Sequence, residues 1–435
     1  MPPLSEDDTI EEERHFMNVL QTFRDYTSYS LSANNRRRKD LHTLPLEDKK
    51  LLEEIGWKKK LSEIDDAIVS NGNFVKQMIM MHSDMFSRAN EEDGEDGEDQ
   101  DTEQAGHQCH GHDHGHDHSH GPSHHSHSGG HSHSHNHDHD HHPHSGGHDH
   151  SHDHDDHSGS VEKYRPTEFD MNKLRSTLKQ LVREWSEEGK EEREASFAPI
   201  KDALVEHFKN VPESERSKLH VLVPGVGLGR LAYDVAMLGF SCQGNEFSHY
   251  MLIASYFILN RTKSIHEHTI YPYVHSLSNI QNRETLLKQI KLPDALPSAI
   301  PKDVRFSLVA GDFEEVYGDY DPDIGLFDAI LTCFFIDTAK NFLNYLRIIN
   351  KRLSAGGVWI NLGPLLWHWE NNTTNDPSIE LDLEEVKELC KKLGFKLENE
   401  RTIQTNYANN SQSMLGYTYQ ASFWTATKNL NENSD

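Results

Sequence analysis

The fold of this chain is constrained most by one stretch, KLHVLVPGVGLGRLAYDVAMLGFSCQGNE, which occupies residues 218–246. It begins with a short apolar run at residues 219–223, which predicts a buried strand. Apolar residues then recur at helical spacing at residues 229–239, and a second short strand leads to Glu246. This order predicts two parallel strands joined by a glycine turn and a helix.

The glycines in the turn indicate a nucleotide-binding loop. Glycine lets the backbone take positive φ and lets a ligand approach closely. The dinucleotide fingerprint G-x-G-x-x-G would need glycine where this chain has Arg230. The spacing of Gly225, Gly227 and Gly229 is instead that of S-adenosylmethionine-dependent methyltransferases, and Glu246 is placed to accept hydrogen bonds from ribose hydroxyls. A tight turn without a ligand is the alternative interpretation of the glycines alone.

Strands alternate with helices over the second half of the chain, which is typical of a parallel sheet. The last two strands follow each other without a convincing helix and predict a hairpin. We therefore expect an α/β fold with a Rossmann-like sheet of the class I methyltransferase type, mostly parallel with an antiparallel edge strand, plus an N-terminal helical region. The later strands are expected at residues 306–310, 327–332, 358–362, 395–403 and 417–425.

The composition divides the chain into three regions. Residues 1–89 show helical spacing of apolar residues and predict an N-terminal helical region. Residues 90–160 form an acidic, His-rich, low-complexity insertion that we expect to be disordered, because it has almost nothing apolar to bury. Residues 161–430 form the α/β domain, with leading helices expected at residues 170–188 and 200–208.

The insertion holds most of the unusual composition. Of the 33 His residues, 23 lie at residues 91–157, together with 17 Asp and Glu and no Lys or Arg. So many imidazoles predict weak, multivalent binding of divalent metals such as Zn²⁺, but no defined metal site can be named. The alternative is an insertion tolerated in a surface loop.

Several function classes find no support. The formal net charge is −28, and the part outside residues 91–157 is still mildly acidic, so we expect no nucleic-acid partner. No apolar run approaches the roughly 18 residues of a membrane helix, and the N-terminus is not a secretory signal, so we expect no membrane partner. The four cysteines show no CxxC pair. These features predict a cytoplasmic protein, with the nucleus as a second location.

Candidate site residues follow the predicted strands, because ligands of open α/β sheets bind at the carboxyl ends of the strands. Asp312 and Phe313 suit an adenine, with the carboxylate accepting from the amine and the ring packing on the base. Asp337 follows the next strand, and His368 lies in the aromatic run LLWHWEN. The alternatives are helix N-caps for Asp312 and Asp337 and a structural role for His368.

The assembled stretches resemble the carnosine N-methyltransferase family. The resemblance lies in EEERHFMNVLQTFRDY, LVREWSEEGKEER, PGVGLGRLA with CQGNEFS, IYPYVHSLSN, AGDFEEVY, CFFIDTAKN and WINLGPLLWHWEN. It covers the chain from its N-terminal helices to near the C-terminus, apart from the insertion. It implies transfer of a methyl group from S-adenosyl-L-methionine to an imidazole nitrogen of carnosine (β-alanyl-histidine), giving anserine, and it implies a homodimer.

The resemblance also implies roles for individual residues. The dipeptide would be held by Asp337, His368, Tyr407 and Tyr419. Of these, Asp337 and His368 are the candidate catalytic residues, because a carboxylate that accepts from the ring N–H would fix the tautomer of the acceptor ring. The methyl donor would be held by Gln180, Arg183, Gly225, Gly227, Glu246, Asp312, Phe313 and Cys333.

Other interpretations stay open at this point. The chain could methylate another His-containing dipeptide, protein histidine or another small molecule. In a different class, it could buffer metals through the His-rich tract, with the α/β domain as a scaffold.

Overall fold

The structure, a computed structural model, describes residues 6–80, 164–318, 325–373 and 376–428 of the 435-residue chain. The insertion expected to be disordered, residues 90–160, lies entirely outside the described residues, because the description stops at residue 80 and resumes at residue 164. The predictions for the insertion therefore stay predictions.

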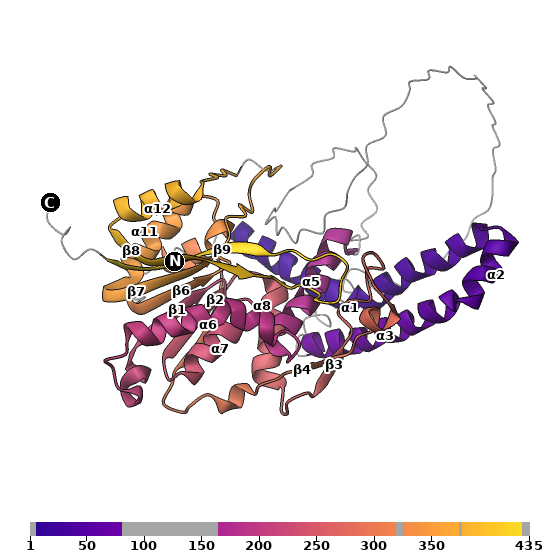
Figure 1. The fold of residues 1–435 in the computed structure, drawn as a ribbon, viewed down its shortest axis with the longest axis horizontal. Helices are drawn as coiled ribbons and strands as arrows, with labels where there is room; N and C mark the ends of the chain where they lie inside the picture. Colours follow the sequence, from indigo (N-terminus) through magenta and orange to yellow (C-terminus); the bar gives the residue numbers. More distant parts are fainter. Residues whose placement is uncertain (1–5, 81–163, 319–324, 374–375, 429–435) are drawn as a thin grey trace, which may run out of the picture. The chain divides into compact units, whose positions relative to one another are not determined.

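A seven-stranded sheet forms the centre of the α/β domain (Figure 1), in the order β5-β2-β1-β6-β7-β9-β8. The first five of these strands run parallel to one another. The mostly parallel α/β fold is thus confirmed. The strands are β1 (His220–Pro224), β2 (Ser241–Glu246), β5 (Phe306–Ala310), β6 (Phe327–Cys333), β7 (Leu353–Gly363), β8 (Phe395–Thr405) and β9 (Tyr419–Lys428).

The antiparallel strand lies one position inside the edge, where we expected it at the edge itself. β8 and β9 form the predicted hairpin, but β9 inserts between β7 and β8 and runs antiparallel to both. Burial explains this order. Phe423 and Trp424 of β9 are fully buried, whereas most of β8 between Lys396 and Gln404 is exposed. The charged strand therefore takes the edge, where unpaired backbone groups can face water.

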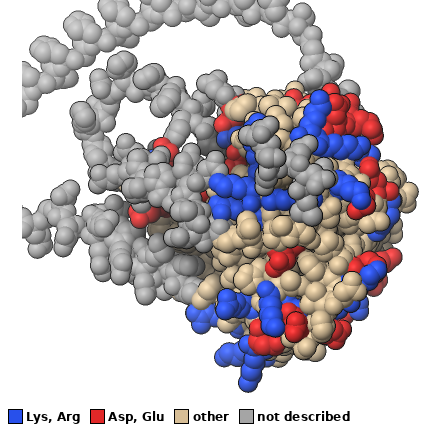
Figure 2. Space-filling model, turned by 90° about the vertical axis from the view of Figure 1, so that its left-hand side faces the viewer, with Lys and Arg blue, Asp and Glu red and all other residues tan. Residues whose placement is uncertain are grey.

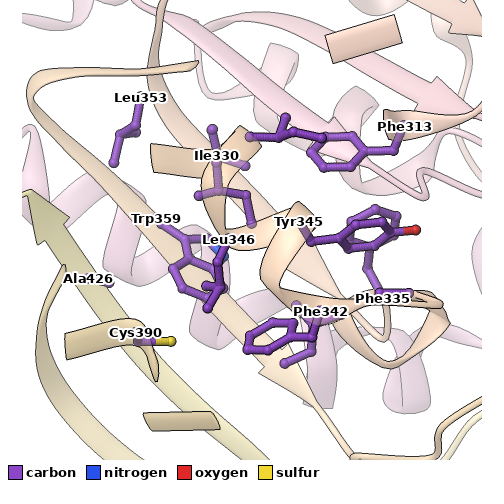
Figure 3. Close-up of a cluster of buried hydrophobic side chains, with 14 of the residues drawn as sticks. Phe313, Ile330, Phe335, Phe342, Tyr345, Leu346, Leu353, Trp359, Cys390 and Ala426 are labelled. Atoms are coloured by element: carbon purple, nitrogen blue, oxygen red, sulfur yellow. The ribbon is translucent and has the colours of Figure 1, made fainter. Parts of the chain in front are cut away.

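Helices cover both faces of the sheet and bury its alternating side chains. On one face, Leu222, Ile330 and Trp359 pack with side chains of α10 (Phe313–Tyr317), α11 (Phe342–Arg352) and α12 (Leu383–Lys392), as part of the cluster drawn in Figure 3. On the other face, Val223 and Leu331 pack against α6 (Lys190–His207) and α7 (Arg230–Met237).

The N-terminal helical region consists of α1 (Glu6–Thr43), α2 (Leu46–Glu54) and α3 (Trp57–Ile79). It packs against two helices of the α/β domain, α5 (Glu168–Trp185) and α8 (His249–Arg261). Ring contacts join Phe23 to Tyr250 and Phe74 to Phe257, at centroid distances of 5.8 and 5.6 Å. These helices therefore share a core with the helices that lead into the sheet.

The other departures from the predicted elements are a second small sheet, a longer helix and several short turns. β3 (His268–Ile270) pairs with β4 (Ile290–Leu292) in a separate two-stranded sheet, and neither strand was predicted from the sequence. The helix expected at residues 200–208 begins earlier, at Lys190, with Pro199 inside it. The other short elements are α9 (Arg283–Leu286) and the 3-10 turns η2 (Glu213–Lys218), η3 (Pro297–Ala299) and η4 (Ile336–Thr338).

Charged residues of both signs lie on the face drawn in Figure 2. Figure 2 shows Lys and Arg side chains interspersed with Asp and Glu on the face that it presents. Among the described residues, no helix is both long and apolar enough to span a bilayer.

Candidate active site

The glycine loop between β1 and α7 has the conformation that its sequence predicts. Gly225, Gly227 and Gly229 have φ angles of 62°, 58° and 86°, in the region that favours glycine. A Cβ at Gly225 would lie 2.5 Å from a ring carbon of Phe335, and a Cβ at Gly227 would lie 2.9 Å from Oε1 of Glu184. The loop is therefore packed closely on both sides, and only glycine fits at these two positions.

Glu246, at the end of β2, is tied to the glycine loop. Its Oε2 accepts a hydrogen bond from the backbone N–H of Gly227 at 2.8 Å. Its Oε1 accepts from the N–H groups of Phe247 and Ser248, at 3.0 and 2.8 Å, just before α8. Burial raises the pKa of this carboxyl, and the three N–H groups oppose that shift. Because an ionised carboxylate offers about four lone-pair positions, one remains for a ribose hydroxyl.

Glu184, at the end of α5, is a site residue that the sequence reasoning missed. Its Oε2 accepts from the N–H groups of Leu228 and Arg230, both at 3.2 Å, and so caps the start of α7. Burial raises the pKa of Glu184 to about 7. The candidates Gln180 and Arg183 lie on the same face of the helix as Glu184 and could have pointed to it. Glu184 itself, however, belongs to no recognisable sequence motif.

Two buried guanidinium groups hold the end of α5 against the loop. Arg193 donates to the backbone oxygens of Arg183, Glu184 and Ser186, at 3.0 to 3.2 Å. Arg230 donates to the oxygen of Glu184 at 2.8 Å. These bonds satisfy carbonyls that a helix end leaves without partners. Arg230, which departs from the dinucleotide fingerprint, thus has a structural role here.

Arg183 and Gln180 point buried polar groups at the site. Arg183 lies 4.7 Å from the ring centroid of Tyr407. Within the described residues, its Nε and Nη2 and the Oε1 of Gln180 make no hydrogen bond. Buried donors and acceptors are normally paired, so these atoms fit a polar ligand. An amino-acid end with a carboxylate and an ammonium group, as in S-adenosylmethionine, matches this set.

Asp312 and Phe313 follow β5, and their surroundings favour structural roles. Oδ1 of Asp312 accepts from the N–H groups of Glu314 and Glu315, at 2.7 and 3.3 Å, so Asp312 is the N-cap of α10. The ring of Phe313 is 2% exposed and contacts Phe335 edge-on at 5.3 Å. The N-cap interpretation of Asp312 is confirmed, and contact of either residue with an adenine stays a prediction.

Cys333 lies at the end of β6, beside Arg183. Burial raises the pKa of its thiol to about 11, although the guanidinium opposes the shift. The group is therefore a neutral thiol at ordinary pH.

An aromatic group forms at the end of β6. Phe334, whose φ of 53° is unusual for a residue with a side chain, places its ring between Tyr407 and Tyr419 at centroid distances of 4.8 and 5.5 Å. Strained backbone of this kind concentrates at functional sites. The structure thus brings together the two tyrosines that the resemblance implied, and it adds Phe334, for which the sequence held no turn signal.

Asp337 and His368 are joined through the backbone. The oxygen of Asp337 accepts from the N–H of His368 at 3.0 Å, and its Oδ2 accepts from the N–H of Leu366 at 2.9 Å. Asp337 is 3% exposed, and burial raises its pKa to about 7. The N-cap alternative for Asp337 is wrong, because Asn341 caps α11. A buried carboxylate free of a capping role can serve a ligand.

The described residues contain no group of three or more His, Cys, Asp and Glu placed to hold a metal ion. The His-rich tract lies outside them.

The strand order, the reversed strand beside one edge and the glycine loop after β1 define a class I methyltransferase fold. The chain belongs to the carnosine N-methyltransferase family, because the model of that family matches residues 160–430.

Relatives of this chain occur in animals and fungi. The carnosine N-methyltransferase of Mus musculus is 46% identical over 263 residues, which are 60% of this chain and 64% of the mouse protein. That of Schizosaccharomyces pombe is 44% identical over 263 residues, or 58% of this chain and 70% of the relative. The match to the mouse protein thus spans just under two thirds of its length.

Among solved structures, the glycopeptide N-methyltransferase MtfA complexed with S-adenosylmethionine is 14% identical, and the match covers 53% of this chain and 93% of MtfA. Its TM-score is 0.31, too low for the likeness to support an inference.

Proposed function

We propose that this chain transfers a methyl group from S-adenosylmethionine to an imidazole nitrogen of carnosine and so forms anserine. Membership of the family supports the reaction type, and the relatives carry the name of this activity. The observation that carries the proposal is the closely packed glycine loop bonded to Glu246.

On the donor side, we assign binding to residues of the loop and of α5. Glu246 would hold the ribose hydroxyls, and Gln180 and Arg183 would hold the amino-acid end through the buried polar atoms that have no hydrogen bond among the described residues. The donor supplies an activated methyl group. The protein therefore mainly has to align the acceptor at near-attack distance.

On the acceptor side, the ring must present a nitrogen without a proton. Free imidazole titrates at about pH 6.5, so the neutral ring is plentiful at about pH 7 to 8. A carboxylate that accepts from the other N–H fixes the tautomer and stabilises the positive charge that develops on the ring. We assign this role to Asp337, because it is buried and is not a helix cap.

The reaction then consists of methyl transfer to the ring nitrogen followed by loss of the proton from the other ring nitrogen. The lone pair of the ring nitrogen forms the new bond to the methyl carbon while the bond from that carbon to sulfur breaks, and the electrons stay on sulfur. The ring N–H then loses its proton to Asp337, whose pKa of about 7 suits transient protonation. His368, Tyr407 and Tyr419 would orient the dipeptide.

A panel of acceptors tests the proposal. Purified full-length protein is incubated with methyl-labelled donor and, in separate reactions, carnosine, other His-containing dipeptides, other small amines and a cell extract. The proposal predicts that carnosine gives the highest kcat/KM. Label found only in proteins of the extract would instead identify a protein-histidine methyltransferase.

We also propose a homodimer formed through the N-terminal helices. Leu46 and Leu51 of α2 and Ile55, which follows the helix, are 69%, 60% and 70% exposed, and α2 has no buried residue. Large apolar side chains exposed at one end of the helical region suit contact with a second copy of the chain. Sedimentation of the full chain tests this, with Leu51→Glu expected to favour the monomer and an unchanged mass in that variant contradicting it.

We propose the cytoplasm as the location, with the nucleus as a second site. Microscopy of the tagged full chain tests this, and enrichment in another compartment would contradict it. We further propose that the His-rich tract binds divalent metal weakly. Zn²⁺ titration of the full chain and of a chain lacking residues 91–157 should show binding only with the tract present.

A further inference from the structure

Two buried carboxylates flank Arg183. Oε1 of Glu184 lies 3.7 Å from Nη1 of Arg183, and Oε1 of Glu192 lies 3.5 Å from its Nε. The side chains of Arg183 and Glu184 are about one twentieth exposed, and that of Glu192 is 13% exposed. Charges removed from water in this way interact strongly with their neighbours. We call these three residues the arginine triad.

Each carboxylate of the arginine triad also holds one loop. Glu184 accepts from two backbone N–H groups at the glycine loop, as described above. Glu192, in the first turn of α6, accepts from the N–H groups of Ala408 and Asn409 at 2.6 and 3.0 Å. One guanidinium group therefore lies between two loops, each of which is bound through a pair of amides.

The loop held by Glu192 carries a tyrosine of the acceptor side. Ala408 has a φ of 50°, a strained conformation for alanine, and the hydrogen bonds that the two amides donate to Glu192 offset its cost. This conformation places the ring of Tyr407 against Arg183 and Phe334. Releasing the two amides from Glu192 would therefore free the tyrosine.

We propose that the arginine triad couples the two halves of the site, so that a donor bound at Arg183 tightens the loop that carries Tyr407. Glu184 and Glu192 act as positioning residues. The inference rests on the proposed function, since it takes the donor to bind at Arg183.

The chemistry of the donor explains the direction of the coupling. Its carboxylate can accept from Nη2 of Arg183, which has no hydrogen bond among the described residues, while Nε stays beside Glu192, and this fixes the guanidinium plane. Its ammonium group favours the ionised form of the nearby carboxyls. A charged Glu192 holds the amides of Ala408 and Asn409 more strongly than a neutral one.

Hydrogen exchange of the full chain measures this coupling without any acceptor. S-adenosylhomocysteine, the demethylated donor, has the same amino-acid end. The proposal predicts that it slows exchange in peptides covering residues 406–416 by about tenfold, within the usual range of coupling between sites. Calorimetry on the same sample establishes that the ligand is bound.

Variants of Glu192 separate coupling from general stability. Glu192→Gln should bind S-adenosylhomocysteine within about threefold of the wild type but lose most of the protection at residues 406–416, and Glu192→Asp should keep part of it. Glu194→Gln is the matched control. It lies on the same helix, its carboxylate pairs only with Lys201 among the described residues, and it should keep full protection.

The possible outcomes distinguish the coupling from the proposed function. Protection in the wild type that is lost in Glu192→Gln and kept in Glu194→Gln supports the inference. Ligand binding without protection in the wild type, or full protection in Glu192→Gln, overturns the inference and leaves the proposed function standing. Failure of the wild type to bind S-adenosylhomocysteine overturns the proposed function, and the inference falls with it.

Discussion

Asp337 is buried without a basic partner among the described residues, and its carboxylate accepts the backbone N–H of Leu366. Burial raises its pKa to about 7, well above the value of an exposed carboxyl, and keeping the group ionised there costs stability. Strongly shifted carboxyls in a cleft are candidates for acid and base roles. At the scale of residues, this burial leads to one prediction about turnover and one about the pH dependence of stability.

Replacing the carboxylate by an amide tests its role in catalysis. Asp337→Asn should lose on the order of 10²-fold or more in kcat, because the amide cannot offset the developing ring charge. Its affinity for S-adenosylhomocysteine should stay within about threefold. Steady-state kinetics and calorimetry measure the two quantities. Turnover near that of the wild type would reject the assignment.

The raised pKa also predicts how stability depends on pH. The folded-state pKa lies above the unfolded value of about 3.9, so the ionised group destabilises the folded chain. The penalty grows as pH rises from about 4 to about 7 and is then constant, on the order of 4 kcal/mol or less. Asp337→Asn removes it, so the Tm of the variant should gain on the wild type over this range.

Thermal melts of both proteins across the pH range check this expectation. Asp202→Asn, which removes an exposed carboxyl of α6, is the control and should follow the wild type closely. A Tm difference for Asp337→Asn that stays flat with pH would contradict the raised pKa.

At the scale of elements, the sequence predicted best where one physical reason dominates. The unit from β1 to β2 follows its glycines and apolar spacing, and β5 was predicted with its observed bounds. The start of α6 was missed because Pro199 is typical of a first helical turn, yet the helix continues through it. The position of β9 between β7 and β8 depends on pairing between strands that are far apart in the sequence. The charged residues of β8 were the one local sign that β8 takes the edge.

Among the site residues too, those set by local sequence could be predicted and those set by distant contacts could not. Glu246 and Asp337 follow strands and were predictable from topology, and the resemblance supplied Gln180 and Arg183. Glu184 and Glu192 act on backbone amides of distant loops. No local pattern records which loop folds back onto a helix, so their roles needed the structure.

The glycine loop gives a prediction at this scale. Gly225→Ala should weaken binding of S-adenosylhomocysteine by about tenfold or more, because its Cβ would collide with Phe335 and displace the loop. Gly356→Ala is the matched control. Its φ is 79°, but no atom lies within 4 Å of the added Cβ.

Calorimetry and chemical unfolding separate the two effects. The control should lose about 1 kcal/mol of stability from the strained backbone and keep its affinity. Equal affinities in the two variants would show that the loop does not hold the donor.

At the scale of the whole molecule, the buried side chain of Asn71 is one of the links between the N-terminal helices and the α/β domain. Asn71 of α3 accepts from the N–H of Tyr271 and donates to its oxygen, at 2.7 and 2.9 Å. It also donates to the hydroxyl of Tyr26, which lies 2.7 Å from Nε2 of His275. The segment that follows β3 is therefore fixed to α1 and α3.

Loss of this side chain should destabilise the protein. Asn71→Ala leaves partly buried backbone groups of Tyr271 without these partners, so we expect the free energy of unfolding to fall by about 2 kcal/mol. Asn260→Ala, at an exposed position, should change it by less than about 0.5 kcal/mol. Urea unfolding compares them, and similar values would mean that Asn71 does not join the two parts.

Deletion of residues 91–157 separates the enzyme from a metal-buffering protein. The described site draws no residue from this segment, so methyl transfer should keep kcat and KM within about twofold of the full chain. A loss of activity on deletion would give the His-rich tract a part in the reaction.

The central claim is methyl transfer to the imidazole ring of carnosine, and mass spectrometry of the reaction product tests it most directly. Carnosine is incubated with full-length protein and donor labelled in its methyl group. The account predicts a product that is heavier by one labelled methyl group, with the label on a ring nitrogen after fragmentation. Carnosine recovered unlabelled, or labelled only at its amino terminus, would contradict it.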